Sequence, residues 1–169
     1  MRYKALPPLE ELRENIDYNP DTGILTWKKT PTYCIKGKTL GKDQGNGYLQ
    51  TRYRDSFFLC SRLAYYIYHG IDPLEMQVDH INGNRLDNRI KNLRLATHSQ
   101  NQCNSGLNKL NKSGFKGVCW FRPTKQWKAY IRVQGKQHHL GYFTDKQDAI
   151  KARRIAEIKH HGEFRRQDQ

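Results

Sequence analysis

Apolar residues recur along the chain in short runs, and the spacing within each run predicts one element. Leu9, Leu12 and Ile16 follow two prolines at helical spacing, which predicts a short amphipathic helix. The next runs predict strands and then an aromatic helix that ends at a glycine. The expected bounds are 24–28 for a first strand, 47–53 and 57–62 for a hairpin, and 62–69 for the helix.

Residues 78–84 (Val-Asp-His-Ile-Asn-Gly-Asn) predict a strand that runs into a tight Asn-Gly turn. A helix is expected from Leu95 to about Gly106, which would make this part of the chain a strand, a loop and a helix. The aromatic helix at 62–69 is expected to pack beneath it.

Three strands and one helix are expected in the last third of the chain, with the strands at 115–121, 126–133 and 137–143. The helix, from about Asp145 to His161, carries an alanine-rich stripe that can pack closely on a sheet. We therefore expect an α+β protein with two domains joined by a linker rich in Asn, Ser, Gly and Lys. The expected bounds are 1–106 for the first domain, with its core at about 74–106, 107–113 for the linker and 114–165 for the second domain.

Composition changes this picture by indicating a partner. A length of 169 residues with 36% hydrophobic content suits two modest modules better than one large core. The formal net charge of +14 predicts a polyanion as partner, with nucleic acid ahead of an anionic membrane. Residues 113–169 carry 13 basic and 5 acidic side chains, so the strongest phosphate contact is expected in the C-terminal third.

Other classes of protein are disfavoured. No apolar run approaches the roughly 20 residues of a membrane-spanning helix, and the start of the chain has no signal-peptide core, so a cytoplasmic protein is expected. The cysteines form no Cys-x-x-Cys pair, which argues against a zinc knuckle and a disulfide framework. We expect them to be reduced packing residues: Cys34, Cys60, Cys103 and Cys119.

Asp79 and His80 are the leading candidates for chemistry. Neighbouring residues on a strand point to opposite faces, so one side chain can bind a cation while the other reaches a water across a phosphate. A solitary histidine is more often structural than catalytic, and an Asp-His dipeptide also occurs by chance. Residues 85–102 add further metal-ligating and hydrogen-bonding side chains, which favours phosphodiester hydrolysis.

Asp79, His80, Asn92 and Asn101 resemble the HNH, or ββα-metal, nuclease motif, in the variant whose last histidine is asparagine. The resemblance covers about residues 78–104. It implies that His80 is the general base and that Asp79 and Asn101 bind one divalent cation. It also implies that Asn92 holds the connecting loop in shape.

The ligand set implied by this resemblance favours Mg²⁺ or Mn²⁺, one ion per active site, because Mg²⁺ keeps waters and accepts phosphate oxygens beside a few protein oxygens. The metal would stabilise charge on the phosphate and on the leaving 3′ oxygen while His80 takes a proton from water. His98 is an alternative ligand, or else a phosphate contact or part of a solvated helix face. Arg94 is a candidate phosphate contact, an assignment that Arg85, Arg89 and Lys91 share.

Four motifs within about residues 113–164 resemble the APETALA2/ethylene-response-factor DNA-binding domain: Gly-Val-Cys-Trp, Gln-Trp-Lys-Ala-Tyr-Ile-Arg, Leu-Gly-Tyr-Phe and Asp-Ala-Ile-Lys-Ala. In that family a three-stranded antiparallel sheet lies in the major groove with one helix on its back. Period-two alternation along the second strand predicts an inner face toward the helix, made of Trp127, Ala129, Ile131 and Val133. The outer face is made of Lys128, Tyr130 and Arg132. The expected DNA-contacting residues are Lys116, Arg122, Lys128, Tyr130, Arg132 and His139, together with Arg94.

The leading hypothesis is a site-specific, metal-dependent endonuclease that nicks double-stranded DNA as a monomer. Residues 17–27 and 61–64 resemble the N-terminal region of phage HNH homing endonucleases, which implies a homing role and a bacteriophage origin, with action in the host cytoplasm. Neither a small-molecule substrate nor a membrane partner is expected. The alternative is an inactive, sequence-specific DNA-binding regulator that has kept the fold, and an RNA-directed nuclease is less favoured.

Overall fold

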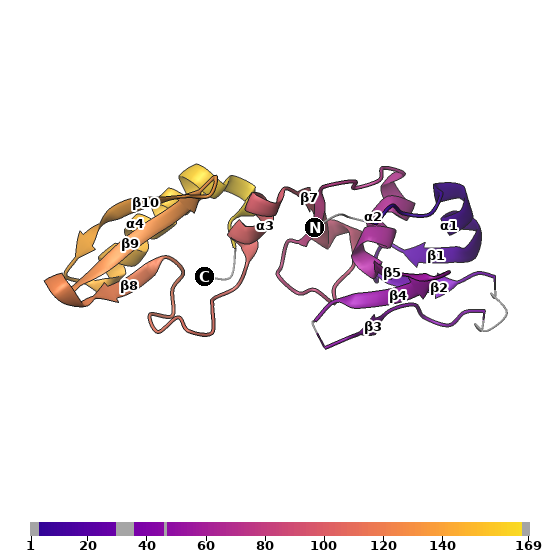
Figure 1. The fold of residues 1–169 in the computed structure, drawn as a ribbon, viewed down its shortest axis with the longest axis horizontal. Helices are drawn as coiled ribbons and strands as arrows, with labels where there is room; N and C mark the ends of the chain where they lie inside the picture. The colour runs from indigo at the N-terminus through magenta and orange to yellow at the C-terminus, as the bar shows by residue number, and fades with distance from the viewer. Residues whose placement is uncertain (1–3, 30–35, 46, 167–169) are drawn as a thin grey trace. The chain divides into compact units, whose positions relative to one another are not determined.

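The computed structural model describes residues 4–29, 36–45 and 47–166 (Figure 1). The chain divides into two compact units, Met1–Thr97 and His98–Gln169. Helices occur beside small antiparallel sheets, so the expected α+β class is confirmed. The division falls earlier than the bound expected at 106, because helix α3 (His98–Asn104) groups with the second unit.

In the described part of the first unit, two α-helices combine with three small antiparallel sheets. β1 pairs with β2, β4 lies between β3 and β5, and β6 pairs with β7. In chain order the elements are α1 Leu9–Asn15, β1 Ile16–Asn19, β2 Ile24–Trp27, β3 Lys42–Asp43, β4 Leu49–Tyr53, β5 Ser56–Leu59, α2 Cys60–His69, β6 Gln77–His80, the 3-10 turn η1 Ile90–Asn92 and β7 Leu93–Ala96. The expected helix at 62–69 therefore begins two residues earlier, where the second strand of the hairpin ends.

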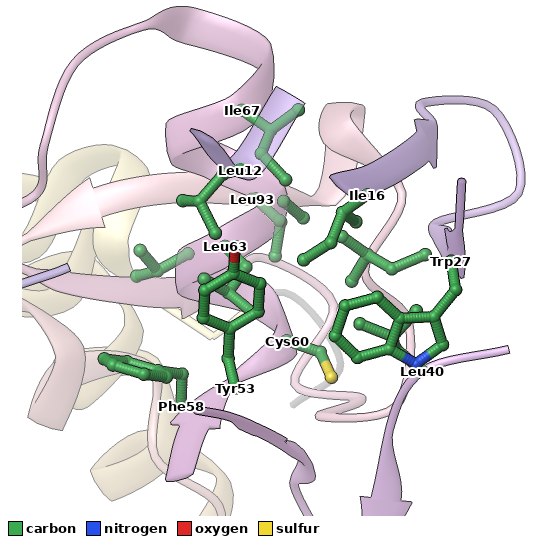
Figure 2. Close-up of a cluster of buried hydrophobic side chains, with 13 residues drawn as sticks. Leu12, Ile16, Trp27, Leu40, Tyr53, Phe58, Cys60, Leu63, Ile67 and Leu93 are labelled. Atoms are coloured by element: carbon green, nitrogen blue, oxygen red, sulfur yellow. The ribbon is translucent and has the colours of Figure 1, made fainter. Parts of the chain in front are cut away.

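One cluster of buried hydrophobic side chains joins these elements (Figure 2). Its members are Leu12, Ile16, Leu25, Trp27, Leu40, Tyr53, Phe58, Cys60, Leu63, Ala64, Ile67, Val78 and Leu93. Each fully buried leucine stabilises the fold by about 2 kcal/mol. Because Val78 lies on β6 and Leu93 on β7, the hairpin that carries Asp79 and His80 is anchored in this core.

Arg62 fixes residues 72–76, the segment that leads into β6, by hydrogen bonds and an ion pair. This guanidinium is buried in α2 and donates to the carbonyl oxygens of Met76 at 2.8 Å and Leu74 at 3.0 Å. Its Nη2 also lies 3.7 Å from a carboxylate oxygen of Asp72. The approach to Asp79 is therefore fixed by hydrogen bonds from α2 as well as by packing.

The expectation of a helix from Leu95 was wrong. Leu95 and Ala96 belong to β7, where they pair with Val78 and Gln77. Pairing with a strand that is already anchored in the core outweighs the local helical preference of these residues. The helix that follows, α3, runs over His98–Asn104 and ends before Gly106.

In the second unit, α3 is followed by three antiparallel strands and a long helix, α4, that packs against all three strands (Figure 1). The elements are β8 Val118–Phe121, the 3-10 turn η2 Arg122–Thr124, β9 Gln126–Val133, β10 Lys136–Phe143, α4 Lys146–His161 and the 3-10 turn η3 Gly162–Phe164. The predicted strand at 115–121 begins only at Val118, whereas Asp145 caps α4 by accepting from the Gln147 backbone N–H. Along β9, Ala129 and Ile131 are buried and Arg132 is exposed, as the predicted alternation requires, whereas Trp127 and Val133 are only half-buried.

Lys116 fastens α3 to the start of this sheet. Its Nζ donates to the carbonyl oxygens of Gln102, Cys103 and Ser105 at 2.8, 3.2 and 3.1 Å, and to the Ser105 hydroxyl at 2.9 Å. A cation at the C-terminus of a helix is also favoured by the helix dipole. Lys116 therefore has a capping role in this structure, and its expected DNA contact stays a prediction.

Cys60, Cys103 and Cys119 are free thiols, and Cys34 lies outside the described residues. None of the helices in the described part of the chain has the length and hydropathy of a membrane span.

We expect Lys116→Met to destabilise the second unit by about 1–2 kcal/mol, because three backbone carbonyls at the end of α3 lose a charged donor. Urea unfolding should register this loss, and hydrogen exchange should localise it to faster opening around residues 98–105. Lys112→Met, at an exposed position in the preceding loop, is the matched control. Equal stability of the two variants would contradict the capping role.

Candidate functional site

The register of β6 against β7 determines which side chains meet in the candidate site. Asp79 is paired with Arg94, and His80 with Leu93. Directly paired residues of antiparallel strands share a face, so Asp79 and Arg94 lie on one face of the hairpin. His80 lies on the other face, with Val78 and Leu93 of the hydrophobic core.

Asp79 and Arg94 form an ion pair that is largely shielded from water. Arg94 Nε and Nη2 donate to Asp79 Oδ2 at 2.9 and 2.8 Å, and the two side chains are 13% and 5% exposed. Taking a carboxylate out of water is costly unless a positive charge compensates it. Arg94 is thus the counter-ion of Asp79 in this structure, and the phosphate contact expected from the sequence stays a prediction.

His80 is 4% exposed, and its Nε2 lies 3.0 Å from the side-chain oxygen of Asn88. Burial lowers the pKa of His80 below its ordinary value, against the opposing effects of the Asn88 hydrogen bond and the Asp79 charge. The imidazole is consequently neutral at physiological pH. This is the form that a general base requires.

Two side chains from other parts of the first unit lie near this imidazole. The ring of Tyr48, just before β4, is 6.1 Å from the ring of His80, measured between centroids. The guanidinium carbon of Arg85 lies 4.5 Å from the centroid of the Tyr48 ring, within cation–π range. This arrangement brings the positive charge of Arg85 near the candidate base, where, besides burial, it contributes to lowering the pKa of His80.

The loop between β6 and β7 is held closed by polar side chains. Asn92 Oδ1 accepts from the Asn82 backbone N–H at 2.9 Å, and Asn92 Nδ2 donates to the Asp87 carbonyl at 2.8 Å. Arg89 donates twice to the Asp87 carboxylate, at 2.7 and 2.6 Å, and these bonds are the main reason that the pKa of Asp87 is lowered to about 2. Asn92 therefore contacts both ends of the loop, in the manner that its assigned role requires.

The residues assigned to a metal fit a hard cation by their chemistry. Asp79 and Asn101 both offer oxygen donors, which Mg²⁺ prefers, and the Asp79 carboxylate already attracts the positive charge of Arg94. Within residues 4–29, 36–45 and 47–166 no three His, Cys, Asp or Glu side chains gather as a metal site. Asn101 and the alternative ligand His98 lie on α3, in the second unit, so their pairing with Asp79 stays a prediction.

The second unit presents the expected DNA-contacting residues of β9 and β10 on one face of its sheet. Lys128 is paired with both Cys119 and Tyr142, and Tyr130 with His139, so these side chains share the face opposite the buried alanine and isoleucine of β9. The ring of His139 lies 4.6 Å from that of Tyr142. Arg132 is exposed on the same strand, and Arg122 is exposed in η2.

Residues 58–103 match the family of HNH endonucleases. The chain thus carries an HNH endonuclease domain. The match confirms the resemblance seen around the Asp79-His80 pair and extends it upstream to include α2. It ends before the second sheet, so the resemblance of residues 113–164 to the APETALA2 family stays a prediction.

Two viral proteins are similar to the chain. Protein 3.8 of Escherichia phage T7 is 38% identical over 72 residues, which are 43% of this chain and 60% of that protein. An uncharacterized HNH endonuclease of Acanthamoeba polyphaga mimivirus is 31% identical over 98 residues, which are 58% of this chain and 50% of that protein. The chain thus spans between half and three-fifths of the length of these relatives. No solved structure matches the chain.

Sequence reasoning missed Asn88 and Tyr48 as neighbours of His80. Asn88 lies in a loop with several other asparagines, so neither its residue type nor its spacing distinguishes it. Tyr48 lies just before β4, far upstream in the sequence, and its approach to His80 depends on how the sheets pack. The hydrophobic pattern around Gly47 and Tyr48, before β4, gives no indication that Tyr48 would lie near His80.

We expect Arg94→Met to lower the free energy of unfolding by about 3 kcal/mol without metal, because it leaves the Asp79 carboxylate shielded from water with its main counter-ion removed. Millimolar Mg²⁺ should then raise the melting temperature of this variant more than that of the wild type, since the cation replaces the lost charge. The double variant Arg94→Met with Asp79→Asn should lose this extra stabilisation. An equal effect of Mg²⁺ on all three proteins would contradict a cation site at Asp79.

Proposed function

We propose that the chain is a site-specific, metal-dependent endonuclease that hydrolyses phosphodiester bonds of double-stranded DNA. The observation that carries this proposal is the hairpin of β6 and β7, which has an ion-paired carboxylate on one face and a neutral imidazole on the other. The carboxylate offers a cation site and the imidazole a proton acceptor, the two groups that the hydrolysis requires. The match of residues 58–103 to HNH endonucleases supports the same chemistry.

In the proposed reaction His80 accepts a proton from a water molecule while the water oxygen attacks the phosphorus atom. The new bond joins phosphorus to the water oxygen, and the bond from phosphorus to the 3′ oxygen breaks. The leaving 3′ oxygen takes a proton from solvent, so the products are a 3′-hydroxyl and a 5′-phosphate. A positioned base of this kind accelerates such a step by about 10²–10⁴-fold.

One divalent cation, Mg²⁺ or Mn²⁺, would supply positive charge to the phosphate and to the leaving oxygen when bound. We assign Asp79 and Asn101 as its protein ligands, as the HNH resemblance implies, with Asn92 maintaining the loop. Arg94 would then exchange its bond to Asp79 for a contact with the phosphate. His98 remains an alternative ligand.

For the second unit we propose a role in anchoring the nuclease on its target. The supporting observation is the sheet face that combines Lys128, Tyr130, Arg132 and His139, in the part of the chain with the largest positive charge. Strands of a small sheet can lie in the major groove, where polar side chains reach base edges and cations reach phosphates. Arg122, exposed beside this face, would add a further phosphate contact.

We further propose that the protein acts as a monomer in the cytoplasm of an infected host and nicks one strand, since each chain offers one Asp79-His80 pair. A homing role is supported by the resemblance of residues 17–27 and 61–64 to phage homing endonucleases. The viral origin of the two similar proteins agrees with it.

A DNA-binding regulator without nuclease activity is the second candidate function. The observation that favours it is the Asp79–Arg94 ion pair, because a carboxylate that is satisfied by arginine can persist without a metal. The two candidates share the basic second unit. They differ in whether the protein breaks DNA.

We expect the wild type to convert supercoiled plasmid that carries its target to the relaxed form in the presence of Mg²⁺, and EDTA to abolish this conversion. His80→Ala should lower the rate at least about 100-fold, because the proton acceptor is lost. His160→Ala, at an exposed position of α4, should match the wild type. Equal relaxation by wild type and His80→Ala, or none by either, would refute the enzymatic proposal.

For the anchor, we expect Lys128→Gln combined with Arg132→Gln to weaken DNA binding and to flatten its salt dependence. Each lost phosphate contact should change the slope of log affinity against log salt by about 0.9. Lys151→Gln, on the exposed side of α4, is the control with an unchanged slope. An unchanged slope in the double variant would place the DNA contact on another surface.

A further inference from the structure

The hydrogen bond between His80 and Asn88 defines which nitrogen of the imidazole carries the proton. The Asn88 side chain is buried, and its Oδ1 lies 3.0 Å from His80 Nε2. An amide oxygen can only accept, so Nε2 must be the donor of this bond. In the neutral ring the lone pair then resides on Nδ1, the nitrogen on the other side.

Asn88 is itself held from outside the segment that matches the HNH family. The Tyr18 hydroxyl, on β1, donates to the Asn88 carbonyl at 2.8 Å. Burial is the largest reason that the pKa of Tyr18 is raised, which favours the protonated hydroxyl that donates this bond. Pro20, in the turn that follows β1, accepts from the Ile90 backbone N–H at 3.0 Å.

Gly23 allows this turn to approach the loop closely. A Cβ at this position would lie 2.5 Å from the carbonyl carbon of Asn88 and from the backbone nitrogen of Arg89. Its φ of +76° is also one that residues with a side chain rarely adopt. The β1–β2 hairpin thus packs backbone against backbone on Asn88 and leaves it little room to move.

We propose that Asn88 is a positioning residue that fixes His80 in the tautomer with hydrogen on Nε2, so that Nδ1 accepts the proton from the attacking water. We include Tyr18 and the turn at Gly23 as the support that holds Asn88 in place. This inference rests on the proposed nuclease function for its consequence, whereas the tautomer itself can be measured without any cleavage. It assigns the β1–β2 hairpin, which lies outside residues 58–103, to the working part of the active site.

The first test is the tautomer of His80 in the full chain, read by long-range ¹H–¹⁵N correlation in protein labelled at histidine, with the His80 signal identified by its loss in His80→Ala. The wild type should show hydrogen on Nε2. Asn88→Leu, which keeps the branched shape of the side chain and removes the acceptor, should lose this preference. Asn88→Asp, which restores an acceptor, should regain it. A wild-type His80 with hydrogen on Nδ1, or an unchanged tautomer in Asn88→Leu, would overturn the proposal.

The second test separates positioning from a merely structural role. With plasmid that carries the target, Asn88→Leu should lower kcat about 10- to 100-fold with little change in KM, and Asn88→Asp should recover most of the loss. Tyr18→Phe, which removes only the hydroxyl, should lower kcat less and in the same manner. Asn84→Ala, in the exposed part of the same loop, should leave both constants unchanged.

An equal loss of kcat in the Asn88→Asp and Asn88→Leu variants, both folded by circular dichroism, would argue that Asn88 only maintains the loop. Should Asn88→Leu fail to fold, the wild-type tautomer and Tyr18→Phe still decide the matter. The measured tautomer does not depend on cleavage. A protein that shows the expected tautomer but cleaves no DNA would therefore refute the nuclease function while leaving the geometry intact.

Discussion

The antiparallel pairing of β6 with β7 is the constraint on which the candidate site depends. A shift of one residue in this register would move every side chain of β6 to the opposite face. In the observed register, Val78 and Leu93 anchor the two strands in the hydrophobic core, and Asp79 meets Arg94. The same alternation turns His80 to the other face. The register therefore places the charged Asp79 and the neutral His80 on opposite sides of β6.

This separation gives neighbouring residues opposite electrostatic environments. Asp79 is stabilised as an anion by a guanidinium, whereas His80 is kept neutral chiefly by burial. The proposed hydrolysis requires both conditions within a few ångströms, and adjacent positions on one strand provide them. The loop between the strands is rich in polar contacts, such as those of Asn92. These contacts fix the path of the chain from β6 to β7 and so help to maintain the register that separates Asp79 from His80.

Much of this could be predicted from the sequence, because local patterns carry it. The Asp-His pair before an Asn-Gly turn, the apolar alternation of β9 and the alanine stripe of α4 are encoded by neighbouring residues. Contacts between distant segments could not be read in this way. Arg94 and Lys116 were expected on DNA, yet in the structure Arg94 binds Asp79 and Lys116 binds the end of α3, contacts that only folding creates. Leu95 joins β7 rather than a helix because it pairs with β6. Asn88 was missed for the same reason, since its significance comes from the packing of the β1–β2 hairpin.

We propose that the hairpin of β6 and β7 binds a divalent cation at Asp79, in the place that Arg94 occupies in this structure. Anomalous scattering from Mn²⁺, in crystals of the protein grown with its DNA target, would test this site directly. We expect one Mn²⁺ peak at coordinating distance from the Asp79 carboxylate, with the Arg94 guanidinium turned away from it. An intact Asp79–Arg94 ion pair at saturating Mn²⁺, with the metal absent or bound elsewhere, would contradict it.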